Sequence, residues 1–194
     1  MKPNCIICAV LVSATLALPG APAVSAQTLS TRQDQTPGGS SAERKGFIAG
    51  IGAGGALHRT PERGVTRASL DRTAFAGGID AKIGYAPTDQ FLIYYSAKAV
   101  FTQAADYDAV GISGFGVTYM TRPMSPSFFV TGIAGEGGRA RLASRDWRDG
   151  RAFGVGAGYE FKRHWSISGD ALFLRFGGND KHTVLLATVG HLFY

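Results

Sequence analysis

The nine residues 153–161 read Phe-Gly-Val-Gly-Ala-Gly-Tyr-Glu-Phe, and this run decides the fold of the chain. Its odd-numbered residues are all apolar, whereas its even-numbered residues are glycine or Glu160. Alternation with a period of two is the signature of a β-strand whose two faces differ in chemistry. Three polar residues, 162–164, separate this run from a second alternating run between Trp165 and Phe173. So short a connection predicts an antiparallel hairpin.

The two faces of this hairpin have the reverse of the polarity that a water-soluble barrel needs. The apolar face has aromatic residues at its ends, and the other face carries glycine, serine and the carboxylates Glu160 and Asp170. A transmembrane β-barrel has strands of about ten residues, an apolar band toward lipid, aromatic girdles at both interfaces and a polar lumen. The hairpin therefore predicts an all-β, antiparallel transmembrane barrel.

The end of the chain strengthens this interpretation. The last predicted strand, 183–194, has one apolar face formed by Val184, Leu186, Leu192 and Tyr194. Together with the run 154–161 and the polar turn into Trp165, this ending resembles the small eight-stranded outer-membrane barrels of the OmpA-like and opacity-protein-like superfamily. The resemblance implies a location in the outer membrane of a Gram-negative bacterium. It also implies that the terminal aromatic residue, Phe193 or Tyr194, is the signal that the barrel-assembly machinery reads.

Eight segments are expected to form strands. They are 47–57, 73–86, 91–102, 109–120, 128–135, 152–161, 165–173 and 183–194. An even number of strands places both ends of the barrel on the same side of the membrane. The register of 109–120 and of 128–135 stays undecided, because apolar residues lie on both faces of these two segments. The stretch 136–150 is too polar to cross lipid, so we expect a long loop there.

The first residues of the chain predict export. Residues 1–26 contain Lys2, then an apolar run, and then the small-x-small site Val24-Ser25-Ala26, which together indicate a cleaved signal peptide. Residues 27–45 are rich in Ser, Thr, Gln, Gly and Pro, so we expect a disordered periplasmic linker. The outer-membrane barrel domain then comprises 46–194.

Composition limits the chemistry of the exported protein. Both cysteines, Cys5 and Cys8, lie in the predicted signal peptide, so the mature chain is expected to contain no thiol. The net charge is +6, but the basic residues are scattered, so we expect no nucleic-acid partner. The four histidines lack ligand spacing, and we expect no metal and no cofactor. We expect a monomer.

The predicted strands direct five charged side chains into the lumen. These residues are Asp80, Lys82, Lys98, Glu160 and Asp170. An eight-stranded barrel is just wide enough for side chains to fill it, and charges that are buried there must be paired. We expect an ion-pair network that plugs the lumen. The alternative is a path for ions or protons that opens when these pairs rearrange.

Two surface features suggest contacts with the membrane. Four arginines in the expected long loop, Arg139, Arg141, Arg145 and Arg148, are candidates for binding the phosphates of outer-leaflet lipopolysaccharide. The equally open alternative is a loop that is charged only to remain solvated. Outer-membrane lipid, lipopolysaccharide and the barrel-assembly machinery are thus the expected partners.

We interpret the chain as a non-enzymatic barrel with a structural or surface-interaction role. Two other functions are alternatives. The motif His164-Trp165-Ser166 resembles the His-x-Ser pair of lipid A deacylases, but it falls in a predicted periplasmic turn, away from the outer leaflet. A soluble lipocalin-like binding barrel would need an apolar lumen and a polar exterior. We expect no catalytic residue, and we expect Ile79→Arg to destabilise the barrel more than Gly156→Ser does.

Overall fold

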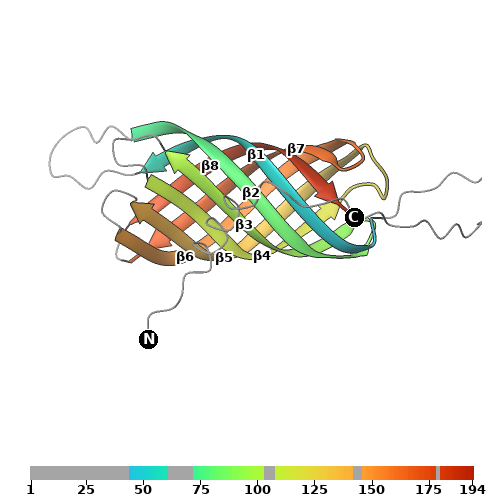
Figure 1. The fold of residues 1–194 in the computed structure, drawn as a ribbon, viewed down its shortest axis with the longest axis horizontal. Helices are drawn as coiled ribbons and strands as arrows, with labels where there is room; N and C mark the ends of the chain where they lie inside the picture. Colours follow the sequence, from blue (N-terminus) through green and yellow to red (C-terminus); the bar gives the residue numbers. More distant parts are fainter. Residues whose placement is uncertain (1–43, 61–71, 103–107, 142–145, 178–179) are drawn as a thin grey trace, which may run out of the picture. The chain divides into compact units, whose positions relative to one another are not determined.

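Strands of alternating polarity close into a single ring in the computed structural model (Figure 1). The structure describes residues 44–60, 72–102, 108–141, 146–177 and 180–194. The predicted signal peptide and all of the predicted linker except its last two residues lie outside these ranges. In the part of the chain described, no helix has the length and apolarity needed to span a membrane.

The ring consists of eight antiparallel strands in sequence order, and β8 closes on β1. The strands are β1 (Gly46–Thr60), β2 (Arg72–Thr88), β3 (Phe91–Thr102), β4 (Asp108–Met120), β5 (Ser127–Arg141), β6 (Asp146–Lys162), β7 (Trp165–Phe176) and β8 (Lys181–Phe193). Closure leaves no strand edge unpaired along the ring. The predicted eight-stranded antiparallel barrel is therefore confirmed.

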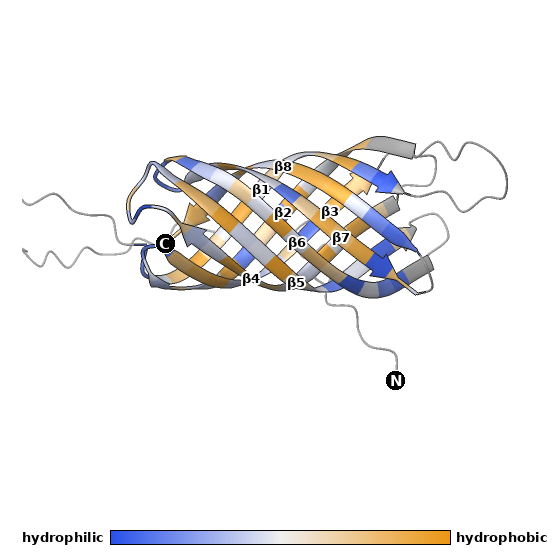
Figure 2. Cartoon of the chain, turned by 180° about the vertical axis from the view of Figure 1, so that it is seen from behind, coloured by the Kyte–Doolittle hydropathy of each residue, from blue (hydrophilic) through white to orange (hydrophobic). Residues whose placement is uncertain are grey.

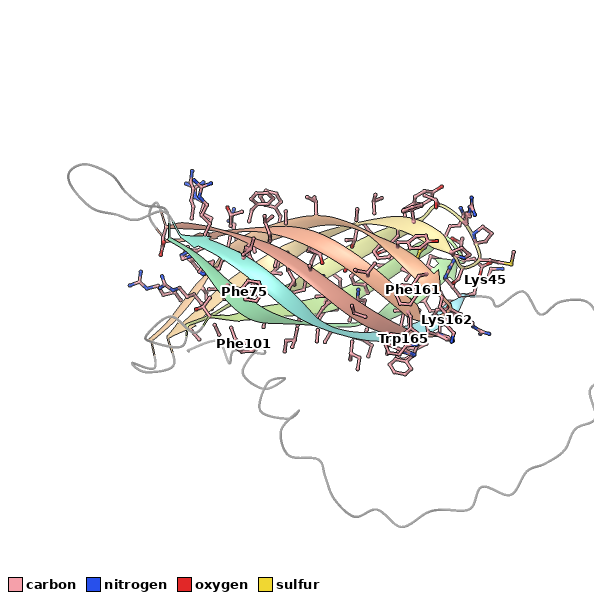
Figure 3. All side chains as sticks on the ribbon, turned by 90° about the horizontal axis from the view of Figure 1, so that it is seen from above. Lys45, Phe75, Phe101, Phe161, Lys162 and Trp165 are labelled. Atoms are coloured by element: carbon pink, nitrogen blue, oxygen red, sulfur yellow. The ribbon has the colours of Figure 1, made fainter. Side chains whose placement is uncertain are left out.

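The outer surface of the barrel carries a band of exposed apolar side chains. On β1 the band extends from Phe47 to Leu57, and Arg59 is the next outward residue. Ten residue steps on a strand tilted by about 40° cover roughly 25 Å, the height of the apolar band in membrane barrels. Figure 3 shows Phe75 and Phe101 toward one end of the band, and Phe161 and Trp165 toward the other. Figure 2 shows the strand ends to be more hydrophilic than the middle.

The structure resolves the register of the two ambiguous strands. On β4, Phe115 is 74% exposed and lies outside, whereas Ile112 is 1% exposed and lies in the lumen. On β5, Phe128 lies outside, and its neighbour Phe129 packs inside against a buried cluster. Sequence alternation failed here because the lumen itself accepts large apolar side chains.

The apolar face predicted for the last strand points into the lumen. The expectation that this face contacts lipid was therefore wrong. Val184 and Leu186 are 0% and 1% exposed, whereas Leu185 and Val189 are about half exposed. The ladder with β7 fixes this register, because Leu186 is opposite the inward Asp170. Val184 and Leu186 thus fill the lumen.

The predicted loop at 136–150 is wrong for most of its length. Strand β5 continues to Arg141, and β6 begins at Asp146, with Glu136 opposite Arg151 in the ladder. A strand that rises beyond the apolar band meets water on its outer face, so polar residues there do not prevent pairing. The β5–β6 hairpin therefore extends past the band as a sheet.

The lumen is layered rather than uniformly polar. One apolar layer comprises Ala56, Ala76, Val100, Val110, Ile112, Ile133, Ala152, Leu172, Leu174, Phe176, Val184 and Leu186. A second layer, near the short turns, comprises Ile48, Ala86, Leu92, Tyr94 and Met120, with Phe129, Leu192 and Tyr194 packed against it. Charged and hydroxyl side chains lie between these two layers.

Inward glycines provide the space for these layers. A Cβ on Gly78 would lie 2.3 Å from Leu186 Cδ1, and a Cβ on Gly154 would lie 2.6 Å from Leu172 Cδ2. At these two positions the glycines make room for leucine side chains, whereas Gly50 lies against the charged side chain of Lys82. A narrow barrel needs small residues opposite large ones, whatever the polarity of the large ones.

Candidate functional site

The middle of the lumen contains an ion-pair cluster that joins strands from opposite sides of the barrel. Lys98 Nζ lies 3.1 Å from Asp80 Oδ2 and 2.9 Å from Asp170 Oδ2. Asp80 is the direct ladder partner of Lys98, whereas Asp170 projects from β7. Ser96 donates a hydrogen bond to Asp80 Oδ1 at 3.0 Å. All four side chains are buried. Each of the three charges lies beside a charge of opposite sign, as buried charges require.

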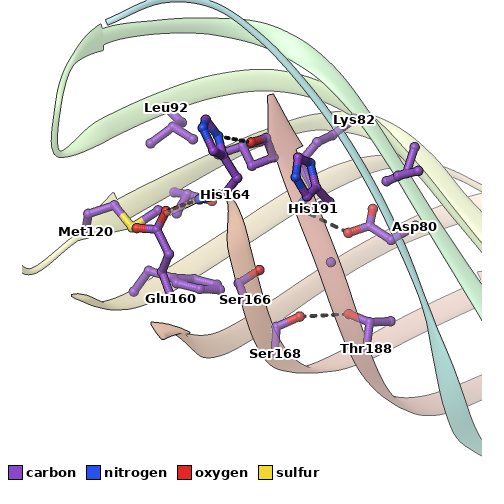
Figure 4. Close-up of a pocket in the computed structure, with 15 residues that line it drawn as sticks. Asp80, Lys82, Leu92, Met120, Glu160, His164, Ser166, Ser168, Thr188 and His191 are labelled. Carbon is purple, nitrogen blue, oxygen red and sulfur yellow. Dashed lines mark hydrogen bonds and ion pairs between the residues drawn. The ribbon is translucent and has the colours of Figure 1, made fainter. Parts of the chain in front are cut away.

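Lys82 belongs to the same cluster but is less enclosed. Its Nζ lies 3.1 Å from Asp80 Oδ2 and 5.4 Å from the centre of the Tyr94 ring. It lines a small cavity that also contacts Glu160, Ser168 and Thr188 (Figure 4). The cavity has a volume of about 40 Å³. That is room for about three water molecules, since each needs about 10–15 Å³.

Glu160 lies apart from this cluster and has its own partners. Its side chain is 2% exposed and forms an ion pair with the buried side chain of Arg44, which comes just before β1. Tyr194 Oη donates to Glu160 Oε1 at 3.2 Å, and the backbone N–H of His164 donates to the same oxygen at 3.3 Å. Burial, and then the Glu160 carboxylate, raise the pKa of the Tyr194 phenol, which therefore stays protonated at neutral pH.

Arg44 closes the end of the barrel where the short turns lie. Its Nη1 donates to the backbone carbonyls of Asp89, Arg122 and Pro123 at 2.8–3.1 Å. Its backbone N–H donates to Asp89 Oδ1 at 2.7 Å. Sequence reasoning missed this residue because it precedes the first alternating run, and no local pattern links it to a carboxylate 116 positions later.

The structure divides the five predicted lumen charges into two groups. Asp80, Lys82, Lys98 and Asp170 are together, and Glu160 is paired with Arg44 instead. With Arg44 included, the cations Arg44, Lys82 and Lys98 match the anions Asp80, Glu160 and Asp170 in number. The arrangement can hold two sides of the barrel together without net buried charge.

Gly156 faces this cluster and is a poor position for a mild substitution. A Cβ there would lie 2.3 Å from Asp170 Oδ1 and 2.8 Å from the backbone oxygen of Gly169. Asp170 cannot withdraw freely, because Lys98 holds its other oxygen. That Gly156→Ser costs less than Ile79→Arg stays a prediction, but a serine here would have to displace Asp170 or the backbone of Gly169.

A third polar group lies at the opposite end of the lumen. His58 Nε2 is 2.9 Å from His182 Nδ1, and His182 Nε2 is 3.1 Å from Asp180 Oδ1. The two rings are stacked and the edge of Phe176 packs against His182. Arg139 Nη1 lies 3.9 Å from Asp180 Oδ2, so this arginine points into the barrel rather than toward lipid.

The other predicted lipopolysaccharide arginines have different settings. Arg148 is the ladder partner of Arg139 and is exposed. Arg145 and the side chain of Arg141 lie outside the described structure. Among the described residues, Arg151, Arg175 and Lys181 face outward side by side at this end, in addition to Arg59 of β1. Sequence reasoning missed this row because it placed Arg151 and Arg175 at the borders of loops.

The rival enzyme motif is not assembled. His164 Nδ1 lies 2.7 Å from the backbone oxygen of Leu192, and its ring packs on His191 and Tyr194. Within the described residues, no hydrogen bond joins His164 to Ser166, and no group of three or more His, Cys, Asp or Glu side chains could hold a metal ion.

Comparison with known proteins identifies the architecture. No protein-family model and no curated protein match the chain. A crystal structure of Ail, the attachment invasion locus protein of Yersinia pestis, superposes with a TM-score of 0.52 at 14% identity, covering 77% of this chain and 99% of that one. The structure of Ail in complex with the heparin analogue sucrose octasulfate gives a TM-score of 0.50 at 15% identity, covering 76% and 99%. The chain therefore has the fold of a small eight-stranded outer-membrane barrel.

Proposed function

We propose that this chain is a non-enzymatic barrel of the outer membrane of a Gram-negative bacterium, with a structural or surface-interaction role. The observation that carries the proposal is the outer band of exposed apolar side chains, with aromatics near its two ends. Burying such a band in lipid is favourable, whereas exposing it to water would promote aggregation. The lipocalin-like rival fails on the same observation, because its exterior would be polar.

The filled lumen supports a structural role rather than transport. Two apolar layers enclose the cluster of Asp80, Lys98 and Asp170, and the cavity beside this cluster is only about 40 Å³. Rearranging the cluster would leave buried charges without partners, which is costly in a medium of low polarity. We propose that the ion pairs, together with the apolar layers, plug the lumen.

Conductance across a planar bilayer tests the plugged lumen. After insertion of the refolded barrel, we expect no stable single-channel steps, because the lumen offers no continuous water-filled path. A control for insertion is protection of the strands from added protease. Reproducible steps of uniform size from protease-protected protein would contradict a plugged lumen.

A surface role would involve the β5–β6 hairpin, which extends beyond the apolar band. On this hairpin Arg148 is exposed, whereas Arg139 points into the barrel toward Asp180, and Arg141 and Arg145 complete the arginines of the segment. Arginine binds phosphate and sulfate groups through two parallel hydrogen bonds. We propose lipopolysaccharide as a partner of the barrel, and the heparin analogue bound to Ail makes other surface polyanions a second class to test.

The barrel-assembly machinery is the other proposed partner, and the end of β8 is its proposed signal. Phe193 is 52% exposed on the outer face, whereas Tyr194 points inward to Glu160. Because an exported chain exposes its apolar strands until it inserts, deletion of Phe193 and Tyr194 is expected to lower the membrane yield severalfold.

The Tyr194→Phe variant separates the two roles of this ending. It removes the hydrogen bond to Glu160 but keeps a terminal aromatic ring, so its membrane yield is expected to match that of the parent chain. Quantitative immunoblots of membrane and periplasmic fractions measure both variants. Unchanged membrane yield of the truncated chain would argue against a terminal signal.

A further inference from the structure

Three cationic side chains lie side by side on the outer face, just above the apolar band. Arg151 on β6 is opposite Arg175 on β7, and Arg175 is opposite Lys181 on β8. All three are exposed. Like charges that face each other on neighbouring strands destabilise a sheet. This arrangement is therefore one that a bound anion would stabilise.

Neighbouring carboxylates do not neutralise this cationic row. Glu136 is opposite Arg151 on β5, but in the described part of the chain no ion pair joins any carboxylate to Arg151, Arg175 or Lys181. Arg59, the outward residue of β1 at this level, already has a partner. The row thus offers two guanidinium groups and one ammonium group to an external ligand.

An aromatic pair lies directly below the row on the same strands. Phe153 and Phe173 are ladder partners with ring centroids 4.9 Å apart, and Thr183 is beside them on β8. These residues and the three cations line one depression of the outer surface. The depression thus has a charged upper rim and apolar walls.

A second depression lies deeper in the apolar band, on β1, β7 and β8, with Phe75 of β2 and Val155 of β6 at its edges. Its floor is made of small residues, Gly55, Gly169, Ala171 and Ala187, and its walls include Leu57, Phe75 and Leu185. Its volume is about 580 Å³, and it is open toward the outside of the barrel. A Cβ on Gly169 would meet no atom within 4 Å, so the floor is open to an external occupant.

We infer that this face of β6–β8 binds one molecule of lipid A, the phosphorylated and acylated anchor of lipopolysaccharide. Its phosphate would lie on Arg151, Arg175 and Lys181, and an acyl chain would lie over Gly169 and Ala187. The inference rests on the proposed outer-membrane location. The row lies at the end of the barrel opposite the short turns, which is the outer-leaflet end in such barrels. An anionic group and an apolar chain joined in one molecule match both depressions.

Titration of lipid A into phosphatidylcholine vesicles that hold the folded barrel tests the inference. Because a ligand that binds only the folded state raises the unfolding midpoint, the midpoint reports an apparent Kd. Neutralising the row by R151Q/R175Q/K181Q is expected to raise that Kd at least about tenfold, since charge-assisted contacts to phosphate are lost. The triple variant R122Q/K162Q/R163Q removes the same charge at the other end and is expected to leave the Kd unchanged.

A second pair of variants tests whether an acyl chain binds in the lower depression. Gly169→Leu fills the floor of the lower depression, whereas Gly132→Leu adds the same side chain on β5, where a Cβ also meets no atom within 4 Å. Gly169→Leu is expected to weaken lipid A binding severalfold and Gly132→Leu to leave it unchanged. Inorganic phosphate and dephosphorylated lipid A serve as partial ligands, and neither is expected to reproduce the full shift in the midpoint.

Each outcome has a defined meaning. Equal Kd values for the two triple variants would overturn the phosphate site, and equal values for the two leucine variants would overturn the acyl groove. A single substitution, Arg175→Gln, replaces the triple variant if that protein fails to fold. A parent barrel that folds in phosphatidylcholine but shows no shift with lipid A would overturn the inference alone. A parent chain that fails to insert into any vesicle would instead overturn the proposed function.

Discussion

Replacing Lys98 by methionine is expected to destabilise the folded barrel by about 3–5 kcal/mol, the typical cost of breaking a buried ion pair from one side. Methionine nearly preserves the volume of the side chain but removes the charge that lies between Asp80 and Asp170. Among the described residues, Asp80 would keep Ser96 and Lys82 as partners, whereas Asp170 would lose the ammonium group that it pairs with. Urea unfolding of vesicle-inserted protein measures the loss.

A neutral version of the cluster is the matched control. The variant D80N/K82M/K98M/D170N removes all four charges of the cluster together, and replacing a whole buried ion cluster costs far less than breaking it. It is expected to recover most of the stability that Lys98→Met loses. If Lys98→Met unfolds at the urea concentration of the parent, the cluster does not stabilise the barrel.

The second large effect is expected on the outer face. Ile79 points outward from the middle of β2 and is 41% exposed. Arginine at this position would place a charge near the bilayer midplane, at a cost of about 2–4 kcal/mol. The same unfolding measurement in lipid vesicles checks the prediction.

Depth within the membrane provides the control for this variant. Phe75 is outward on the same strand but lies near the end of the band (Figure 3). Arginine near the interface costs about 0–1 kcal/mol for its charge, so Phe75→Arg is expected to be the milder variant. Ile79→Ala separates the loss of the isoleucine side chain from the addition of charge. Equal stability of Ile79→Arg and Ile79→Ala would mean that Ile79 does not face lipid.

Sequence alone predicted the faces of β2, β3, β6 and β7 because the charged and serine residues in the middle of these strands all point inward. On β3, for example, Ile93 and Tyr95 lie outside, while Ser96 and Lys98 lie inside. A pattern of this kind assigns the inward and outward faces of a strand without any knowledge of how the strands pair. The strand count and the direction of these faces followed from it.

The same reasoning failed where the lumen is apolar. On β8, Val184, Leu185 and Leu186 follow one another, so hydropathy cannot tell the lipid-facing side chain from the lumen-facing ones. Only the pairing of β8 with both β7 and β1 decides the register. The polar ends of β5 and β6 were missed for a related reason, because a strand outside the membrane carries no apolar signal.

The charged sites show the same limit. Alternation placed Asp80, Lys98 and Asp170 on inward faces, but which of them meet depends on the stagger of the strands around the ring. Glu160 pairs with Arg44, which lies outside any strand. The row of Arg151, Arg175 and Lys181 exists only through the ladders that align three strands.

Cell fractionation combined with heat-modifiability on a gel tests the membrane-barrel account most directly. We expect the chain in the outer-membrane fraction, and we expect the unboiled protein to migrate differently from the boiled protein, because a closed barrel resists detergent until it is heated. Recovery as a soluble periplasmic protein with identical mobility before and after boiling would contradict the account.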